Sequence, residues 1–191
     1  MLRLTGGEFR GRSIQAPEGD RTRPTQAKLR QALFNSIQML VPDARVLDLF
    51  SGSGSLAFEA LSRGAELAVA VETAKPALKL IAKNADTLGV KDRLVIIDQA
   101  VEKCWEALKQ HAPFHVVLAD PPYVGGWETR LLNELPWGEL LAEDGLFCLE
   151  WGLQKSRADS LPDELPFLVK VREKTYGDSV LTTFRRKEVK S

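Results

Sequence analysis

The fold of this chain is decided by residues 46–57, Val46-Leu47-Asp48-Leu49-Phe50-Ser51-Gly52-Ser53-Gly54-Ser55-Leu56-Ala57. The stretch begins as a short apolar run, typical of a buried strand, and continues into a glycine turn and the start of a helical pattern. Gly52 and Gly54 allow a tight turn at which a ligand approaches the backbone closely. Residues 46–57 therefore predict a strand–loop–helix unit whose loop binds a ligand.

The flanking sequence repeats this alternation. From residue 44 onward, short runs rich in Val, Ile and Leu alternate with helical patterns, which favours a parallel sheet covered by helices on both faces. The predicted strands are Val46–Phe50, Leu67–Val71, Leu94–Ile97, His115–Ala119 and Leu146–Glu150, and the predicted helices are Leu56–Ser62, Lys75–Leu88, Val101–Lys109 and Thr129–Leu141. The last two runs, Leu168–Glu173 and Ser179–Arg185, predict an antiparallel pair at one edge of an α/β fold.

The first 24 residues differ from the rest in composition. They are rich in Gly, Arg and Pro and alternate only briefly, which favours a small hairpin or an extended arm over a helix. Pro24-Thr25 then predicts a helix start, because apolar residues recur every three or four positions from Leu29 to Leu40. We therefore expect a basic arm or hairpin at residues 1–24 and a larger domain at residues 25–191.

The overall composition is that of an ordinary soluble globule. The chain has 191 residues, of which 44% are hydrophobic and 27% charged. No apolar run approaches the roughly 20 residues that span a bilayer, and no signal-peptide pattern opens the chain, so we expect a cytoplasmic protein without a membrane partner. Cys104 and Cys148 and the two histidines are too scattered for a zinc site or a disulfide framework, so we expect no metal. We also expect a monomer.

Acidic residues follow the glycine loop at the ends of the next two strands. Glu72 comes 20 residues after Gly52, where a carboxylate can accept hydrogen bonds from ribose hydroxyls. Asp98 ends the third strand, with Gln99 beside it. Because the carboxyl ends of parallel strands meet at one edge of a sheet, these side chains and the loop are expected to converge on one crevice.

Two cofactors compete for this crevice. Gly52-x-Gly54-x-x-Ala57 satisfies a loose dinucleotide pattern, so a nicotinamide-dependent reductase is one alternative. Asp48 favours S-adenosylmethionine instead, because a carboxylate there would repel a pyrophosphate but suits the cationic amino group of a methionine moiety. A reductase of this length would also have little chain left for a substrate domain.

Asp120-Pro121-Pro122-Tyr123 follows the fourth predicted strand. Two prolines in succession hold a short, extended turn whose carbonyls point outward. A carboxylate, a rigid carbonyl and an aromatic ring together suit a flat ring that bears an NH2 group, such as a nucleobase. Asp-Pro-Pro also occurs in ordinary turns, so the motif alone does not indicate a binding site. The predicted cofactor crevice beside it is what favours a functional role.

Charge is balanced over the whole chain but not along it. The chain has 26 basic and 26 acidic residues, yet residues 1–30 carry seven Lys and Arg against three Asp and Glu, a net of +4. A locally basic segment on a neutral protein is typical of a phosphate-binding arm, although a solvated terminus has the same composition.

With these motifs assembled, the chain resembles the Rossmann-like S-adenosylmethionine-dependent methyltransferases. More narrowly, it resembles the bacterial enzymes that methylate the N2 amine of a guanine in 16S ribosomal RNA. The most specific motif is Gly6-Gly7-Glu8-Phe9-Arg10-Gly11-Arg12, with Arg23-Pro24-Thr25 and Ala32-Leu33-Phe34-Asn35. Asp48–Gly54 and Asp120–Tyr123 are shared by many amino-methyltransferases, so they indicate the chemistry rather than the substrate.

The resemblance implies a mostly parallel seven-stranded sheet, and a target base that is rotated out of its stack. Asp120 and the Pro121 carbonyl would accept the amine hydrogens while Tyr123 stacks on the base. The cofactor would contact Asp48, Phe50, Ser51, Gly52, Gly54, Glu72, Asp98 and Gln99. Phosphates of 16S ribosomal RNA, free or in the small-subunit ribonucleoprotein, would contact Arg10, Arg12, Arg21, Arg23 and Arg30.

Two further readings stay open at this point. An adenine-N6 methyltransferase acting on DNA or RNA would use the same motif, because Asp-Pro-Pro-Tyr suits any exocyclic amine. A nucleic-acid-binding module with a vestigial cofactor pocket is the non-enzymatic alternative, and the presence of both Asp120 and the glycine loop argues against it.

Overall fold

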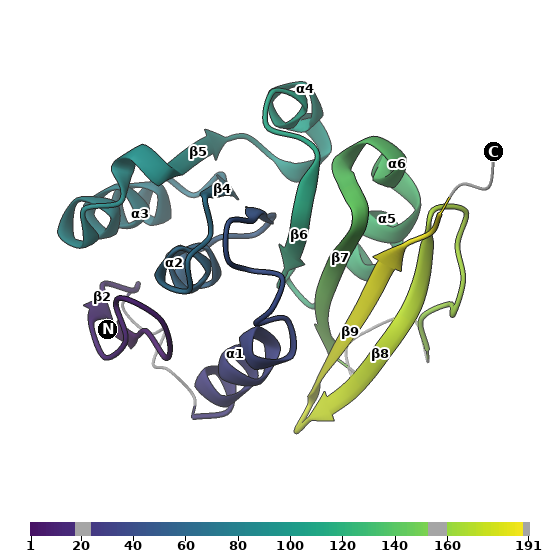
Figure 1. Ribbon diagram of the computed structural model, residues 1–191, viewed down its shortest axis with the longest axis horizontal. Coiled ribbons are helices and arrows are strands. Elements are labelled where there is room, and N and C mark those ends of the chain that lie inside the picture. Colours follow the sequence, from purple (N-terminus) through teal and green to yellow (C-terminus); the bar gives the residue numbers. More distant parts are fainter. Residues whose placement is uncertain (18–23, 153–159, 189–191) are drawn as a thin grey trace.

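The computed structural model describes residues 1–17, 24–152 and 160–188. Its centre is a seven-stranded sheet formed by β3 (Arg45–Asp48), β4 (Leu67–Glu72), β5 (Leu94–Asp98), β6 (Phe114–Ala119), β7 (Leu141–Gly152), β8 (Leu168–Tyr176) and β9 (Ser179–Arg186). The strand order is β5-β4-β3-β6-β7-β9-β8 (Figure 1). The first five strands in this order, β5-β4-β3-β6-β7, pair in parallel with their neighbours. Strand β9 pairs antiparallel with both β7 and β8. The predicted sheet and its antiparallel C-terminal pair are confirmed.

Helices cover both faces of this sheet (Figure 1). They are α1 (Pro24–Ser36), α2 (Ser55–Ser62), α3 (Lys75–Leu88), α4 (Trp105–Lys109), α5 (Trp127–Glu134) and α6 (Trp137–Leu140), with 3-10 turns at Lys91–Arg93 and Val101–Lys103. Core residues of α1, α2 and α3 belong to one apolar cluster, and those of α4, α5 and α6 belong to another. The sheet therefore separates two cores, which is the doubly covered arrangement expected of a parallel sheet.

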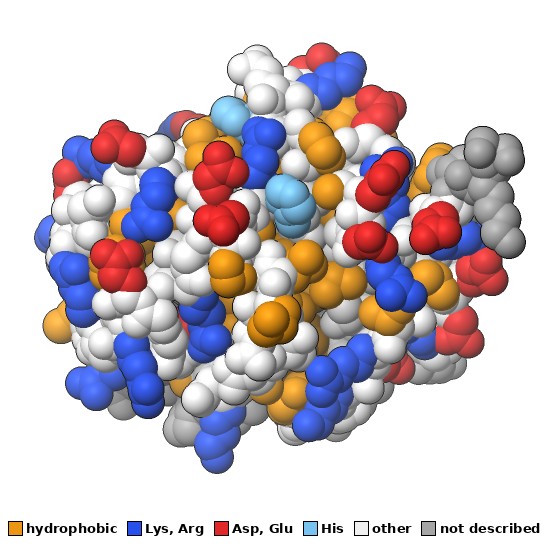
Figure 2. Space-filling view, viewed as in Figure 1, with side chains coloured by type: hydrophobic (Ala, Val, Ile, Leu, Met, Phe, Trp, Pro, Cys, Tyr) orange, Lys and Arg blue, Asp and Glu red, His pale blue; other side chains and the backbone are white. Residues whose placement is uncertain are grey.

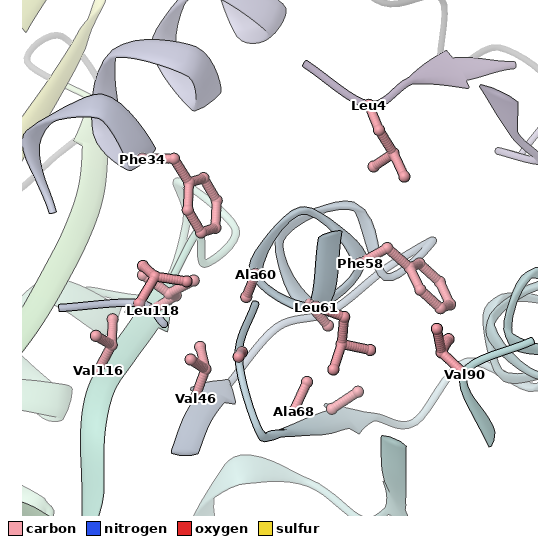
Figure 3. Packing of buried hydrophobic residues seen from close by; sticks show 14 of the residues in the cluster. Leu4, Phe34, Val46, Phe58, Ala60, Leu61, Ala68, Val90, Val116 and Leu118 are labelled. Atoms are coloured by element: carbon pink, nitrogen blue, oxygen red, sulfur yellow. The ribbon is translucent and has the colours of Figure 1, made fainter. Parts of the chain in front are cut away.

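Successive strand residues alternate between these two cores. In β3, Val46 lies in the cluster beneath α1 to α3, whereas Leu47 lies in the cluster beneath α4 to α6. Figure 3 shows Val46, Ala68 and Val116 of three neighbouring strands facing Phe34 of α1 and Phe58 of α2. Both faces of each central strand are thus apolar, so polar side chains gather where the strands end.

Two predicted helices are divided in the structure. Thr129–Leu141 is α5 and α6, because Pro136 cannot continue a helix and Leu135 before it is extended at φ −83° and ψ 142°. Leu141 itself begins β7. Val101–Lys109 is a 3-10 turn followed by α4, and the Cys104 thiol between them donates to the Val101 carbonyl.

Helix α1 ends earlier than the apolar pattern suggests. Its last residue is Ser36, and Ile37 and Leu40 lie in the turn that follows. The Ser36 hydroxyl donates to the Leu33 carbonyl at 2.6 Å, a local bond that competes with the helical ladder. Ile37 and Leu40 still pack against the same core, whereas Met39 between them is exposed.

The N-terminal residues form the predicted small hairpin, from β1 (Leu2–Arg3) and β2 (Ser13–Ile14). This hairpin is fastened to α2 by Glu59, a completely buried carboxylate. Thr5 donates its N–H and its hydroxyl to the two Glu59 oxygens at 2.9 and 2.6 Å, and Arg63 Nε donates to Glu59 at 2.9 Å. Leu4, beside β1, points into the core next to α2 (Figure 3), so the hairpin shares the core of the larger domain.

Within the described ranges, no helix is both long enough and apolar enough to cross a membrane.

Candidate functional site

The glycine loop lies between β3 and α2 at the carboxyl end of the sheet. Ser51 N–H donates to the Val71 carbonyl at 3.0 Å, and Gly54 N–H donates to the Ser51 carbonyl at 2.7 Å, which closes a tight turn. Gly52 and Gly54 have φ of +51° and +81°, in the left-handed region that glycine adopts without strain. A Cβ on Gly52 would meet no described atom within 4 Å, whereas one on Gly54 would lie 2.6 Å from the Phe58 ring. Gly54 is thus required for packing, and Gly52 leaves open space.

Glu72 ends β4 and joins that strand to the glycine loop. Its Oε2 accepts a hydrogen bond from Gly52 N–H at 2.8 Å, and its Oε1 accepts from the N–H groups of Thr73 and Ala74 at 2.7 and 2.8 Å. A carboxylate has about four lone-pair positions, so Glu72 can accept a further bond from a ligand hydroxyl.

Asp48 is the one predicted cofactor residue that is fully enclosed. Its side chain is 1% exposed, and within the described chain neither carboxylate oxygen accepts a hydrogen bond. Burial raises the pKa of Asp48 to about 7, although the nearby Ser51 hydroxyl and the backbone at Ala57 and Phe50 oppose that rise. A buried carboxylate whose nearest donors, at Ser51, Phe50 and Ala57, make no close hydrogen bond to it is uncommon in proteins, so a cationic group would be stabilised beside Asp48.

Two cavities adjoin the loop. The larger, of about 550 Å³, is lined by Glu72, Gln99 and Trp127 among others, and lies outside the ends of β4 and β5. The smaller, of about 240 Å³, extends beneath α1 and is lined by Arg30, Cys148 and Glu150 among others. Four residues line both cavities: Gln26, Phe50, Gly52 and Asp120.

Asp120-Pro121-Pro122-Tyr123 borders these cavities from the end of β6. Asp120 is exposed and lies where the two cavities meet, Pro121 is buried, and Tyr123 lines the larger cavity. The Tyr123 hydroxyl donates to Glu150 Oε1 at 3.3 Å and lies 3.1 Å from the Ser179 hydroxyl oxygen. Burial is the main cause that raises the pKa of Tyr123. Tyr123, the last residue of the motif, therefore anchors it to β7 and β9, and Asp120, the first residue, lines both cavities.

The remaining predicted cofactor residues are divided. Phe50, Ser51 and Gln99 line one cavity or both. Asp98 instead forms an ion pair with Lys75 of α3, outside the residues that line either cavity. Of these two neighbours, Gln99 lines the larger cavity and Asp98 does not.

The predicted RNA-binding arginines also fall into separate groups. Arg10 and Arg12 are exposed on the hairpin, where Arg12 donates to the Thr87 carbonyl at 2.6 Å. Arg30 is only 5% exposed, lies 3.5 Å from Glu59 Oε2 and donates to the Arg3 carbonyl at 2.8 Å. We therefore correct its expected place at an RNA surface, because its guanidinium is committed to fastening the hairpin to α2. Arg21 and Arg23 lie outside the described residues.

A basic surface surrounds the hairpin. An open groove of about 460 Å³ runs between the hairpin and α1 and is lined by Arg3, Arg10 and Arg30 among others. Figure 2 shows Lys and Arg side chains predominating along the lower left edge, where Figure 1 places the hairpin and α1. Exposed Lys28 on α1 extends this surface.

Sequence reasoning missed two residues of the site. Glu150 ends the predicted strand Leu146–Glu150, at the same sheet edge as Asp120, so the signal that identified Glu72 applied to it as well. Burial raises the pKa of Glu150. Trp127 packs edge-on against Phe50 at a centroid distance of 5.0 Å, and no sequence pattern indicated that contact.

Comparison with known proteins identifies the family. The sequence matches the family described as conserved hypothetical protein 95 over residues 2–185. The ribosomal RNA small subunit methyltransferase D of Escherichia coli is 33% identical over 150 residues, 78% of this chain and 74% of that protein. A Thermus thermophilus hypothetical protein, TTHA0928, superposes with a TM-score of 0.77 at 31% identity, over 96% of this chain and 98% of the other.

A more distant structure shows how widely the architecture is shared. A transfer RNA m1G37 methyltransferase of M. jannaschii aligns over 88% of this chain and 52% of its own, with a TM-score of 0.63 at 13% identity. At that identity the likeness concerns the fold alone. The chain belongs to the conserved hypothetical protein 95 family and has the Rossmann-like fold of methyltransferases.

Proposed function

We propose that this protein transfers a methyl group from S-adenosylmethionine to the exocyclic N2 amine of a guanine in 16S ribosomal RNA. One observation carries the proposal: Asp120 lies where the larger cavity, beside the glycine loop, meets the smaller cavity beneath α1. A carboxylate at that junction would lie between a methyl donor bound in the larger cavity and an acceptor base bound in the smaller one. The Escherichia coli relative, named for ribosomal RNA of the small subunit, supports the choice of substrate.

The residues that line the larger cavity, together with Asp48, which lines neither cavity, fit the proposed cofactor. Asp48 is buried without a hydrogen-bond partner among the described residues, and the cationic amino group of the methionine moiety would supply one. Gly52 leaves open space at the loop, Glu72 can accept one further hydrogen bond, from a ribose hydroxyl, and Gln99 lines the cavity for the adenine. The cofactor supplies an electrophilic methyl group on a sulfonium, which becomes a neutral thioether when nitrogen forms the new N–C bond.

The protein's own contribution to the reaction is to hold the amine. Asp120 and the Pro121 carbonyl accept its two hydrogens, which favours a pyramidal nitrogen whose lone pair is no longer delocalised into the ring. Positioning that lone pair toward the larger cavity supplies the orientation that an in-line displacement needs. The amine proton that is lost passes to Asp120 or to water.

The basic surface around the hairpin is the proposed contact for RNA. Arg10 and Arg12 are exposed there, and Arg3 lines the same groove. Lys and Arg that neutralise phosphates bind without reading sequence, so this surface supplies affinity and orientation rather than the choice of base.

The test is methyl transfer to RNA from cells that lack the protein. Purified protein and labelled S-adenosylmethionine are added to total RNA and to small subunits, and the modified nucleotide is mapped. Label on N2 of one guanine in 16S RNA supports the proposal. Label on adenine N6 would support the alternative amino-methyltransferase, and binding of NADH without binding of S-adenosylhomocysteine would support a reductase.

A further inference from the structure

The smaller cavity contains a second carboxylate beside Asp120. In the parallel pairing of β6 with β7, Ala119 is opposite Leu149, so the next residues are Asp120, just after the end of β6, and Glu150, within β7 two residues before its end. Adjacent strands are about 5 Å apart, which places two acidic side chains side by side on one wall. Both Asp120 and Glu150 line the smaller cavity, and Arg30 of α1 lines it as well.

Glu150 is held in a defined position. Its Oε1 accepts the hydrogen bond from the Tyr123 hydroxyl at 3.3 Å, and that hydroxyl is also 3.1 Å from the Ser179 oxygen. Tyr123 packs closely on β7, because a Cβ added to Gly152 would lie 3.2 Å from its ring. The motif that carries Asp120 therefore also orients Glu150, whose side chain is only partly exposed. A carboxylate oriented in this way retains lone pairs for a donor within the cavity.

Guanine and adenine differ at N1, the ring nitrogen next to the carbon that bears the exocyclic amine. Guanine presents its N2 amine, then an N1–H donor, then the O6 acceptor, whereas N1 of adenine is an acceptor. A carboxylate beside the one that holds the amine can accept the N1–H of guanine but repels the N1 lone pair of adenine. An enzyme that takes a base out of its stack reads it through hydrogen bonds to this edge.

We propose that Glu150 is the residue that selects guanine, by accepting the N1–H of the base whose N2 amine is held by Asp120. This inference rests on the proposed function and adds to it the determinant of base specificity. Sites built to hydrogen-bond an N–H reject analogues that lack it far more strongly than apolar pockets reject a change of shape. The preference therefore resides in Glu150, while Asp120 serves any exocyclic amine.

The experiment compares guanine with 2-aminopurine at the mapped target position. 2-Aminopurine keeps the same exocyclic amine but has an N1 acceptor in place of N1–H. The two RNAs compete for methylation by wild type, Glu150→Gln and Glu143→Gln. Glu143 is an exposed carboxylate on the same strand and serves as the matched control. Because each preference is a ratio measured within one protein sample, partial misfolding of a variant cancels.

Wild type and Glu143→Gln are expected to prefer guanine equally. In Glu150→Gln the preference falls at least about tenfold, because the amide N–H can donate to the N1 of 2-aminopurine. An unchanged preference in Glu150→Gln would overturn the role of Glu150 while leaving the proposed function intact. Transfer by wild type to neither RNA would refute the proposed function itself, and this inference with it.

Discussion

The backbone N–H of Gly52 donates a 2.8 Å hydrogen bond to Oε2 of Glu72. This bond joins the glycine loop after β3 to the end of β4, 20 residues further along the chain. Because Glu72 also accepts from Thr73 and Ala74, it fixes the loop, the strand end and the start of α3 together. One carboxylate thus organises the side of the cleft at which we propose that the cofactor binds.

Replacing Glu72 by Ala should weaken binding of S-adenosylhomocysteine. The substitution removes the hydrogen bonds that the Glu72 carboxylate accepts, and a hydrogen bond to a charged group is worth about 1.5–3 kcal/mol. The affinity for S-adenosylhomocysteine, measured by titration calorimetry, should therefore fall at least about tenfold. Glu66→Ala, which removes an exposed carboxylate just before β4, is the control and should bind normally. Equal affinities for wild type and Glu72→Ala would contradict the assignment.

A second prediction distinguishes the role of Gly52 in ligand binding from the role of Gly54 in packing. Gly52→Ala would place a methyl group in open space that both cavities share, so it should reduce cofactor binding and lower stability by about 1 kcal/mol. Gly89→Ala has the same positive φ and open surroundings at the end of α3, so it should lower stability similarly but leave binding unchanged. Gly54→Ala should be the least stable of the three, because its Cβ meets Phe58. Thermal melts and calorimetry on these variants check each statement.

The buried Asp48 predicts a pH dependence. Its pKa is raised from 3.8 to about 7, so the folded, ligand-free protein holds a proton that the unfolded chain has lost. The free energy of unfolding should therefore fall as pH rises from about 4 to about 7, and level off above that. A cationic ligand favours the ionised form, so affinity for S-adenosylhomocysteine should rise between about pH 5.5 and 7.5. In Asp48→Asn both trends should flatten, and an unaltered pH profile in that variant would exclude Asp48 as their source.

Removing Arg10 tests the proposed RNA surface. Arg10→Ala should weaken RNA binding and reduce the slope of log affinity against log salt by about one, as expected for one lost phosphate contact. Arg172→Ala, an exposed cation on β8 at the far edge of the sheet, is the control. Arg30→Ala should act differently and lower the melting temperature, because it leaves Glu59 buried with one cation fewer. If the dependence of RNA affinity on salt concentration were the same in Arg10→Ala as in wild type, Arg10 would not contact an RNA phosphate.

Much of this fold could be predicted from local sequence. Glu72 and Asp120 follow apolar runs, and parallel topology places such residues at one edge of the sheet whatever the exact helix boundaries are. The first strand was predicted to continue to Phe50, whereas β3 ends at Asp48. The division at Pro136 was also readable from the sequence, because proline seldom continues a helix.

Other features depend on contacts between distant residues. Arg30 looks like one of several basic side chains, and only its pairing with Glu59 shows that it is buried. Asp98 ends its strand as predicted, but its carboxylate forms an ion pair with Lys75 of α3. Glu150 gained a role only when the register of β6 with β7 placed it beside Asp120.

The central claim is that Asp120 holds the amine and takes no part in binding the cofactor. The most direct measurement is methyl transfer to the mapped RNA by Asp120→Ala, alongside its affinity for S-adenosylhomocysteine. Asp92→Ala, which removes an exposed aspartate from the 3-10 turn Lys91–Arg93, is the control. We expect transfer by Asp120→Ala to fall roughly 10²–10³-fold while its affinity for S-adenosylhomocysteine stays within a few-fold of wild type. Transfer within a few-fold of wild type would contradict this account.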